Sequence, residues 1–244
     1  MIFLLSSNFG EIITMLVSVA CGFAAPLKSS HILWINLITD SLPALALGVD
    51  EEENKSYMDR PPRGKDESLF AGGGLNCTCF YGALIALISM VAFLQLPVGI
   101  LLRAGNQITP AAIRTLLVDT ELLNRCQTYA FTVLGMSQLF HAIGMRDVET
   151  SLFRMNHLEN QLMIAAFVIG MGLQLLVTEV PYFVVLFGTC RLTLLEWVKL
   201  LVLASMPLFA HELLVFGSCL GEKVNRENRK EATGQAVSSG GRWS

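Results

Sequence analysis

Two polar residues in the first apolar stretch of the sequence could bind a cation. Asn8 and Glu11 lie three residues apart within MIFLLSSNFGEIITMLVSVACGF, which is otherwise built almost entirely of apolar and small residues. Residues at this spacing lie about 5–6 Å apart on a helix, so we expect Asn8 and Glu11 to share a face. A carboxylate at the centre of an apolar membrane helix costs about 2.5–3.5 kcal/mol on insertion scales. A bound cation would offset that cost.

The second apolar stretch supplies three more oxygen donors. In ILWINLITDSLPALALGVD, Asn36, Thr39 and Asp40 stand at positions i, i+3 and i+4, which is one face of a helix. Pro43 follows, and it has no N–H to donate to the carbonyl of Thr39, four residues earlier. Irregular backbone at membrane depth is tolerated where it lines a cavity or a ligand. We therefore expect an amide, a hydroxyl, a carboxylate and a freed carbonyl to converge here.

The chemistry of these donors favours a hard dication. All are oxygens, with no His or Cys among them, so copper and zinc are poorly served. Calcium takes about 6–8 oxygen ligands in flexible geometry, whereas magnesium gives up its water reluctantly. The carboxylates of Glu11 and Asp40 would neutralise one Ca²⁺, and Mn²⁺ also accepts such oxygens. The alternative is hydrogen bonding between helices, a common use of Asn and Thr in membranes, which explains two acids at one depth less well.

Other polar residues within apolar stretches are weaker candidates. Gln138, in TVLGMSQLFHAIG, could add an amide oxygen to the site or could bond to a neighbouring helix. His141, one turn later, is expected to be a packing residue. Glu179 and Glu196 stand near the ends of their stretches, where we expect them to be solvated.

Membrane helices must position these residues. Of the 244 residues, 53% are hydrophobic and 15% are charged, whereas a soluble domain has about 25% charged residues. A helix needs about 20 apolar residues to cross a bilayer. We predict an all-α polytopic membrane bundle of six transmembrane helices over 2–25, 31–49, 78–102, 126–145, 160–180 and 193–216. This membrane domain would cover 1–220, followed by a disordered tail at 221–244. The polar segment 50–69 is either a solvated connector or a docking strip for a cytoplasmic domain.

The distribution of basic residues predicts the orientation in the lipid bilayer. Six spans place both termini on one side. That side carries Lys55, Arg60, Arg63, Lys65, Arg146, Arg154, Lys223, Arg226, Arg229, Lys230 and Arg242. The opposite side carries Lys28, Arg103, Arg114, Arg125 and Arg191, with Lys199 just inside the last helix. Because Lys and Arg accumulate on the cytoplasmic side, we predict a cell-membrane protein with both termini in the cytoplasm. No nucleic-acid partner is expected.

The two donor stretches resemble the fifth and sixth transmembrane helices of P-type calcium-transporting ATPases, of the sarco/endoplasmic-reticulum type and its bacterial relatives. The resemblance rests on SSNFGEI, LWINLITDSLPALALGVD and MDRPPR. It continues through QTYAFTVLGMSQLFHAIGMR and SLFRM, which look like the eighth helix and the loop after it. In this family such a stretch, here about 1–216, is the C-terminal membrane half.

The resemblance also implies a ligand set. The implied calcium ligands are Asn8, Glu11, Asn36, Thr39 and Asp40. Asp40 matches a residue shared between two ion sites in the two-site pumps. Gln138 matches a position where those pumps have a glutamate, so we expect one calcium ion rather than two. Sodium–potassium pumps have an acid at the place of Asn36 and a proline at the place of Gly10, and both differences favour calcium.

Several parts of such a pump are missing from this sequence. It contains no DKTG phosphorylation motif, no GDGxND-type hinge, no nucleotide or actuator domain, and no fourth helix. ATP and Mg²⁺ act through those parts, so we expect this chain alone not to hydrolyse ATP. Its partner would be the N-terminal half of the pump, from the same gene or a split one. The alternatives are a stand-alone membrane cation-binding or regulatory protein, and a non-functional gene remnant.

Overall fold

The computed structural model describes residues 1–49, 74–146 and 160–217, and in these ranges every regular element is a helix, as predicted. The segment 50–69 and the tail 221–244, for which docking and disorder were predicted, lie outside the described residues. The elements are α1 (Ile2–Ala20), α2 (Ser29–Trp34), η1 (Ile35–Thr39), α3 (Ser41–Gly48), α4 (Gly74–Arg103), α5 (Pro110–Leu116), α6 (Thr120–Gly144), α7 (Gln161–Glu179), α8 (Pro181–Phe187) and α9 (Leu194–Ala204).

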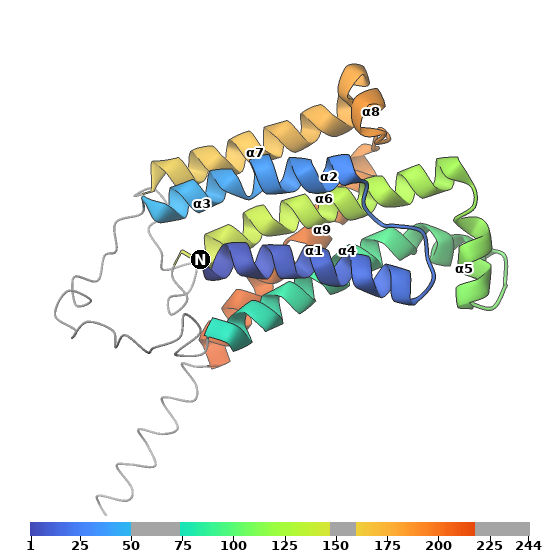
Figure 1. The fold of residues 1–244 in the computed structure, drawn as a ribbon, viewed down its shortest axis with the longest axis horizontal. Coiled ribbons are helices and arrows are strands. Elements are labelled where there is room, and N and C mark those ends of the chain that lie inside the picture. The colour runs from blue at the N-terminus through green and yellow to red at the C-terminus, as the bar shows by residue number, and fades with distance from the viewer. Residues whose placement is uncertain (50–73, 147–159, 218–244) are drawn as a thin grey trace, which may run out of the picture.

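The long helices lie side by side in one bundle (Figure 1). The N-terminus, the end of α3 and the starts of α4 and α7 gather at one end, which we call the N-terminal end. The opposite end, called the distal end, contains α5 and α8. The chain therefore runs back and forth between the two ends, as the predicted topology requires.

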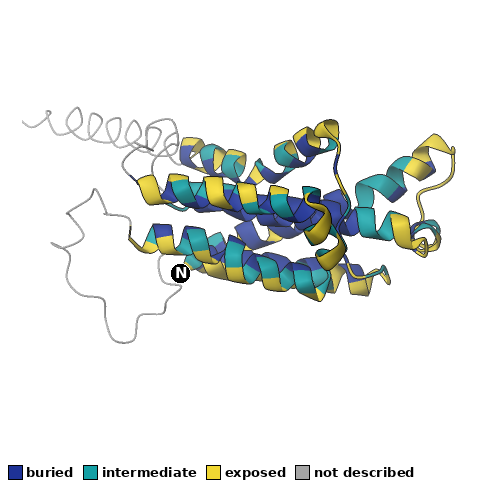
Figure 2. Ribbon diagram, turned by 90° about the horizontal axis from the view of Figure 1, so that it is seen from above, coloured by how far each residue is buried: buried dark blue, intermediate teal, exposed yellow. Residues whose placement is uncertain are grey.

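Within the described ranges, four helices are long and apolar enough to cross a membrane: α1, α4, α7 and the stretch Leu194–Gly217 that begins with α9. The two other predicted spans do not meet these criteria of length and apolar composition, each for a different reason. The span 31–49 is divided among α2, η1 and α3. The span 126–145 lies in α6, whose buried face carries many polar side chains. The outer faces of the bundle are largely exposed in Figure 2, and residues such as Leu16, Val168 and Leu213 make them apolar.

The second predicted span, 31–49, is irregular at the donor residues, as expected from Pro43. η1 is a π-helix, in which the amide of Asp40 donates to the carbonyl of Ile35, five residues earlier, at 2.9 Å. The amide of Ala44 then donates to the carbonyl of Asp40 at 3.1 Å. Because Pro43 has no N–H, the carbonyl of Thr39 loses the donor that a regular α-helix would supply.

Two glycines bring α1 and α4 into close contact. A Cβ added to Gly10 would lie 2.9 Å from Cγ2 of Ile85, and one added to Gly82 would lie 2.7 Å from Cδ1 of Phe9. Real Cβ atoms do not approach other carbon atoms so closely, because interiors are already packed near crystal density. This contact fixes the position of the part of α1 that carries Glu11, the residue after Gly10.

α6 is the central helix of the bundle. It contacts α1, η1, α3, α4, α7 and α9. Its middle part is fully buried, and Phe131 and Leu134 pack in one apolar cluster with Phe93 and Ile85 of α4. Gln138 lies one turn beyond this cluster and is also fully buried. α6 therefore places an amide in the interior, within reach of both α1 and η1.

Candidate cation site

Glu11 of α1 lies between two amide groups from different helices. Its side chain is only 5% exposed. Oε2 accepts a hydrogen bond from Nδ2 of Asn36 on η1 at 3.1 Å, and Oε1 accepts one from Nε2 of Gln138 on α6 at 3.3 Å. Three predicted site residues from three separate elements therefore meet at one carboxylate.

Asp40 lies at the end of η1 and is the least satisfied of the buried acids. It is 2% exposed, and neither carboxylate oxygen has a hydrogen-bond partner among the described residues. Asp40 follows by one helical turn Asn36, whose amide bonds to Glu11. The side-chain oxygen of Gln138 is also buried without a partner. Three acceptor atoms therefore face the interior next to Glu11, and nothing in the described residues donates to them.

This arrangement is electrostatically unfavourable unless positive charge is added. A buried carboxylate needs a partner of opposite charge, because moving one ion from water into a protein interior costs roughly several kcal/mol. Glu11 receives only neutral amide donors, and Asp40 receives none. A dication neutralises both charges at once, and carboxylate, amide and carbonyl oxygens are the donors that Ca²⁺ accepts. The donor set fits such an ion.

The other predicted ligands occupy different surroundings. Thr39 is buried, at 4% exposed, and its Cγ2 methyl faces Gly135 of α6. Asn36 is half-buried, and its Nδ2 donates both to Glu11 and to the carbonyl of Ile32, the latter at 3.1 Å.

The structure does not place Asn8 with the other predicted residues. It is exposed, and its Nδ2 donates to the carbonyl of Leu4 in its own helix at 2.8 Å. The expectation that Asn8 and Glu11 present a common face to the site is therefore not met in the described bundle. The reason is the angle between them: Glu11 points at η1 and α6, whereas the side of α1 that carries Asn8 has no described helix against it.

His141 is a packing residue, as predicted. It is fully buried, its ring lies 4.4 Å from that of Tyr81, and its Nε2 forms a 2.8 Å hydrogen bond with Oγ of Ser6.

Glu179 and Glu196 are partly exposed, and both also bond to protein groups, which the sequence did not predict. Glu179 accepts from the indole of Trp197 at 3.0 Å, and Glu196 pairs with Arg125 at 2.6 Å.

The sequence analysis did not single out Gln174, although it is buried and polar. Gln174 of α7 is 2% exposed, and its amide nitrogen donates to Oγ1 of Thr132 on α6 at 3.3 Å. Its side-chain oxygen has no partner among the described residues. The signal that identified Gln138, a lone amide in the middle of an apolar stretch, is also present in MGLQLLV around Gln174.

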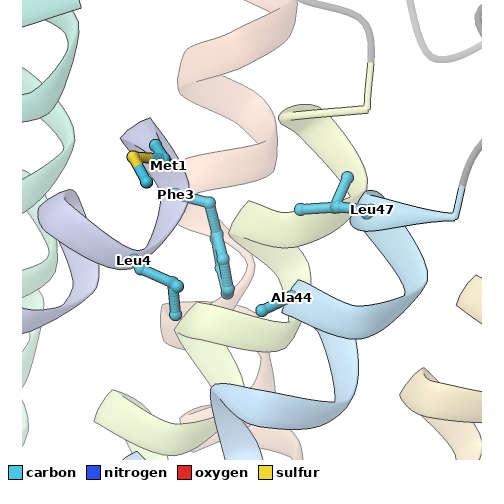
Figure 3. Close-up of a pocket in the computed structure, with 6 residues that line it drawn as sticks. Met1, Phe3, Leu4, Ala44 and Leu47 are labelled. Carbon is cyan, nitrogen blue, oxygen red and sulfur yellow. The ribbon is translucent and has the colours of Figure 1, made fainter. Parts of the chain in front are cut away.

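A separate pocket of about 140 Å³ lies at the N-terminal end, between α1 and α3. Figure 3 shows Met1, Phe3, Leu4, Ala44 and Leu47 around it, all with apolar side chains. It offers no side-chain donor to a cation, so the carboxylate cluster, rather than this pocket, is the candidate cation site.

Comparison with known proteins connects this geometry to a family. The family described as "Cation transporting ATPase, C-terminus" matches residues 24–216. Calcium-transporting ATPase 1 of Bacillus cereus is 38% identical over 214 residues, which are 87% of this chain and 23% of that protein. A calcium-transporting ATPase of Bacillus subtilis is 34% identical over 221 residues, covering 91% of this chain and 22% of that protein. An endoplasmic-reticulum-type calcium-transporting ATPase of Arabidopsis thaliana is 26% identical over 224 residues, again 22% of its length.

The match covers most of this chain but less than a quarter of each of these relatives. The matched family, the all-helical bundle and the four helices suited to cross a bilayer agree with one another. This multi-pass membrane chain belongs to the cation-transporting ATPases and corresponds to their C-terminal region.

Proposed function

We propose that this chain is the ion-binding membrane part of an ATP-driven calcium pump. The observation that supports this most directly is the buried pair of acids, in which Asp40 has no hydrogen-bond partner and follows by one helical turn Asn36, which bonds to Glu11. A pair that served only to join helices would have its oxygens bonded to donors, as buried polar groups usually are. The relatives at 38% and 34% identity are named as calcium-transporting, which supports Ca²⁺ as the ion. Mn²⁺ accepts the same oxygen donors.

The proposed ligands are Glu11 and Asp40 as the two charged groups, with Asn36, Gln138, Thr39 and Asn8 as neutral oxygen donors. In an ion-bound state the amide oxygens of Asn36 and Gln138 would turn toward the ion, which would release Glu11 from their nitrogen atoms. Asn8 would join when the open side of α1 is covered by the remainder of a pump. Because only two negative charges are available here and Gln138 is neutral, we propose a single calcium ion.

ATP hydrolysis belongs to other parts of such a pump. The sequence has no DKTG motif to accept a phosphoryl group, so we expect no acid-stable phosphoenzyme from this chain alone. We propose that its partner is the N-terminal half of a pump, that ATP and Mg²⁺ act there, and that both termini of this chain are cytoplasmic, as the distribution of Lys and Arg predicts.

The test is equilibrium binding of ⁴⁵Ca²⁺ to the purified full chain in lipid nanodiscs. We expect about one bound ion per chain, and we expect Glu11→Gln and Asp40→Asn each to weaken binding by about a hundred-fold or more, because each leaves the dication and the remaining acid unbalanced in a buried site. Ser137→Ala is the matched control, since its buried hydroxyl bonds only to the carbonyl of Leu134 in its own helix. Equal binding by the wild type and both acid variants would contradict the assignment, and two bound ions would contradict the single-ion proposal.

A further inference from the structure

Gln174 is one of three buried glutamines, with Gln127 and Gln138, whose side-chain oxygens have no hydrogen-bond partner among the described residues. Gln174 lies in the last turns of α7, on the distal side of the Glu11–Gln138 contact, and its side chain is 2% exposed. Its nitrogen donates to Thr132 of α6 at 3.3 Å, and its oxygen lies beside Gly135 of the same helix. Oε1 is buried and has no donor among the described residues. A buried acceptor without a donor is rare in folded proteins and calls for an explanation.

Gly135 of α6 locates the place where this oxygen points. A Cβ added to Gly135 would lie 3.4 Å from Oε1 of Gln174 and 3.9 Å from Cγ2 of Thr39. The absence of a side chain at Gly135 therefore leaves Oε1 uncovered on the side where η1 passes. Gly135 is one helical turn from Gln138 on α6, and Thr39 directly precedes Asp40 on η1. The Gln174 oxygen thus opens onto the same irregular segment that holds Asp40.

The surroundings of Gln174, rather than its unpaired oxygen alone, distinguish it from Gln127, whose oxygen is also unpaired and whose nitrogen donates to the carbonyl of Ala25. Gln174 uses only its donor, and the unpaired atom is an amide oxygen, which is a preferred calcium ligand. The neighbouring backbone is irregular as well, since the carbonyl of Thr39 has lost its helical donor at Pro43. Unpaired oxygens from α7, α6 and η1 therefore gather around one short segment.

We infer that the side-chain oxygen of Gln174 is a further ligand of the cation site and contacts the ion, or one of its water ligands, from the α7 side of η1. This inference rests on the proposed function, because it extends the same site to a fourth helix. Calcium takes about 6–8 oxygens, so the two carboxylates and four neutral side chains proposed above leave positions that Gln174 and water can fill. Thr132 acts as a positioning residue, because its hydroxyl holds the amide with the oxygen toward the ion.

The experiment measures ⁴⁵Ca²⁺ binding to the full chain in nanodiscs for four variants. Gln174→Leu removes the oxygen and keeps the bulk, whereas Gln174→Glu keeps an oxygen at the same place. Gly135→Ala covers the oxygen with a methyl group at an ordinary contact distance, so it tests the site even if Gln174→Leu does not fold. Thr178→Val is the control, because its buried hydroxyl bonds only within α7, to the carbonyls of Gln174 and Leu175.

We expect Gln174→Leu and Gly135→Ala to weaken calcium binding about ten-fold, in line with the loss of one bond to a charged group. Gln174→Glu should restore binding to at least the wild-type level, and Thr178→Val should leave it unchanged. The melting temperature of the calcium-free chain should be the same in Gly135→Ala as in the wild type.

Three results would overturn parts of this account separately. Wild-type binding in Gln174→Leu and Gly135→Ala, together with loss of binding in Asp40→Asn, would overturn the inference and leave the proposed function intact. Equal weakening by Leu and Glu at position 174 would assign the residue to packing alone and would also overturn it. No calcium binding by the wild type would overturn the proposed function itself.

Discussion

The acids at the distal end of the bundle and the acids at its centre are bonded in opposite ways. Glu196, near the start of α9, accepts hydrogen bonds from Arg125 at 2.6 Å and from the hydroxyl of Tyr129. Its second oxygen accepts from the amide and the hydroxyl of Thr193, at 2.7 and 2.8 Å, which completes a capping box. Every oxygen of this carboxylate is held by fixed donors from the protein, and one of them is a cation.

The central acids lack such donors. Asp40 has none, and Glu11 has two neutral amides at 3.1 and 3.3 Å. Yet both are more deeply buried than Glu196, whose side chain is 17% exposed. The same chemical group is therefore used to fix helices at one end and is kept available at the centre. Since the distal acid obtains its positive charge from Arg125, we expect the central pair to obtain it from a bound ion.

The backbone carbonyls show the same difference, because those at the distal end are bonded to fixed donors and one at the centre is not. At the distal end, the ammonium of Lys28 donates to Oδ1 of Asn124 at 2.8 Å and to the carbonyl of Gly188 at 2.7 Å, which connects three segments of the chain. Burial lowers the pKa of this ammonium. Gly188 has a left-handed backbone, with φ of 62°, and a Cβ there would lie 2.3 Å from Nζ of Lys28. At the centre, by contrast, η1 leaves the carbonyl of Thr39 without its helical donor.

The largest effect is expected from the distal acid. Glu196→Ala removes the partner of Arg125 and Tyr129 and one half of the capping box of α9, so we expect the free energy of unfolding to fall by about 2–4 kcal/mol. Calcium affinity should stay within about two-fold of the wild type, since a distal bond is not part of the ion site. Denaturation of the chain in detergent and ⁴⁵Ca²⁺ binding measure the two quantities. The exposed Glu121→Ala is the control; a loss of calcium binding in Glu196→Ala alone would break the comparison.

Removal of calcium should have the next largest effect. At free calcium about 100-fold above the dissociation constant, binding stabilises the folded chain by about 2.7 kcal/mol, and a chelator should remove this stabilisation. The loss should be seen in the wild type and in Glu196→Ala as a lower melting temperature, but not in Asp40→Asn. A chelator effect that persists in Asp40→Asn would show that calcium acts outside the central site.

Neutralising the central acid should stabilise the ion-free chain. Asp40→Asn removes a buried charge that has no partner, so in the presence of chelator we expect the free energy of unfolding to rise by about 1–2 kcal/mol. Asp119→Asn is the matched control, because Asp119 caps α6 through its bond to the amide of Glu121, and Asn caps a helix about as well. Destabilisation by Asp40→Asn in chelator would mean that the carboxylate has a protein partner after all.

The two regions also differ in how well the sequence predicted them. The gathering of acids and amides at the centre was predictable because its signal is local: acids and amides at helical spacing within apolar stretches, followed by a proline. Glu11, Asn36, Asp40 and Gln138 do come together. The irregular backbone before Pro43 was also predicted, since a missing N–H has a definite consequence four residues earlier.

Features that depend on which helices become neighbours were not predictable in this way. Glu196 lies 71 residues from Arg125 in the sequence, and Glu179 lies 18 residues from Trp197, so no local pattern identifies these pairs. Asn8 has the right type and spacing, yet the described helices leave its side of α1 uncovered. Helical periodicity gives the direction of a side chain on its own helix, but the packing of the bundle decides what that side chain meets.

The smallest effect is expected from a neutral bond at the distal end. The buried hydroxyl of Thr128 donates to the carbonyl of Asn124 at 2.8 Å and accepts from the amide of Cys190 at 2.9 Å, which attaches α6 to the segment between α8 and α9. Thr128→Val keeps the shape and leaves one amide unpaired. Because Cys190 is only half-buried, water can partly replace the bond, and the free energy of unfolding should fall by about 1 kcal/mol.

Thr115→Val is the control, since Thr115 is exposed and bonds only within α5. Thr128 and Gln138 are ten residues apart on α6, about 15 Å along the helix, so calcium affinity should not change. A measurable loss of calcium binding in Thr128→Val would show that α6 transmits changes between the two ends, and the division between a fixed distal end and an available centre would fail.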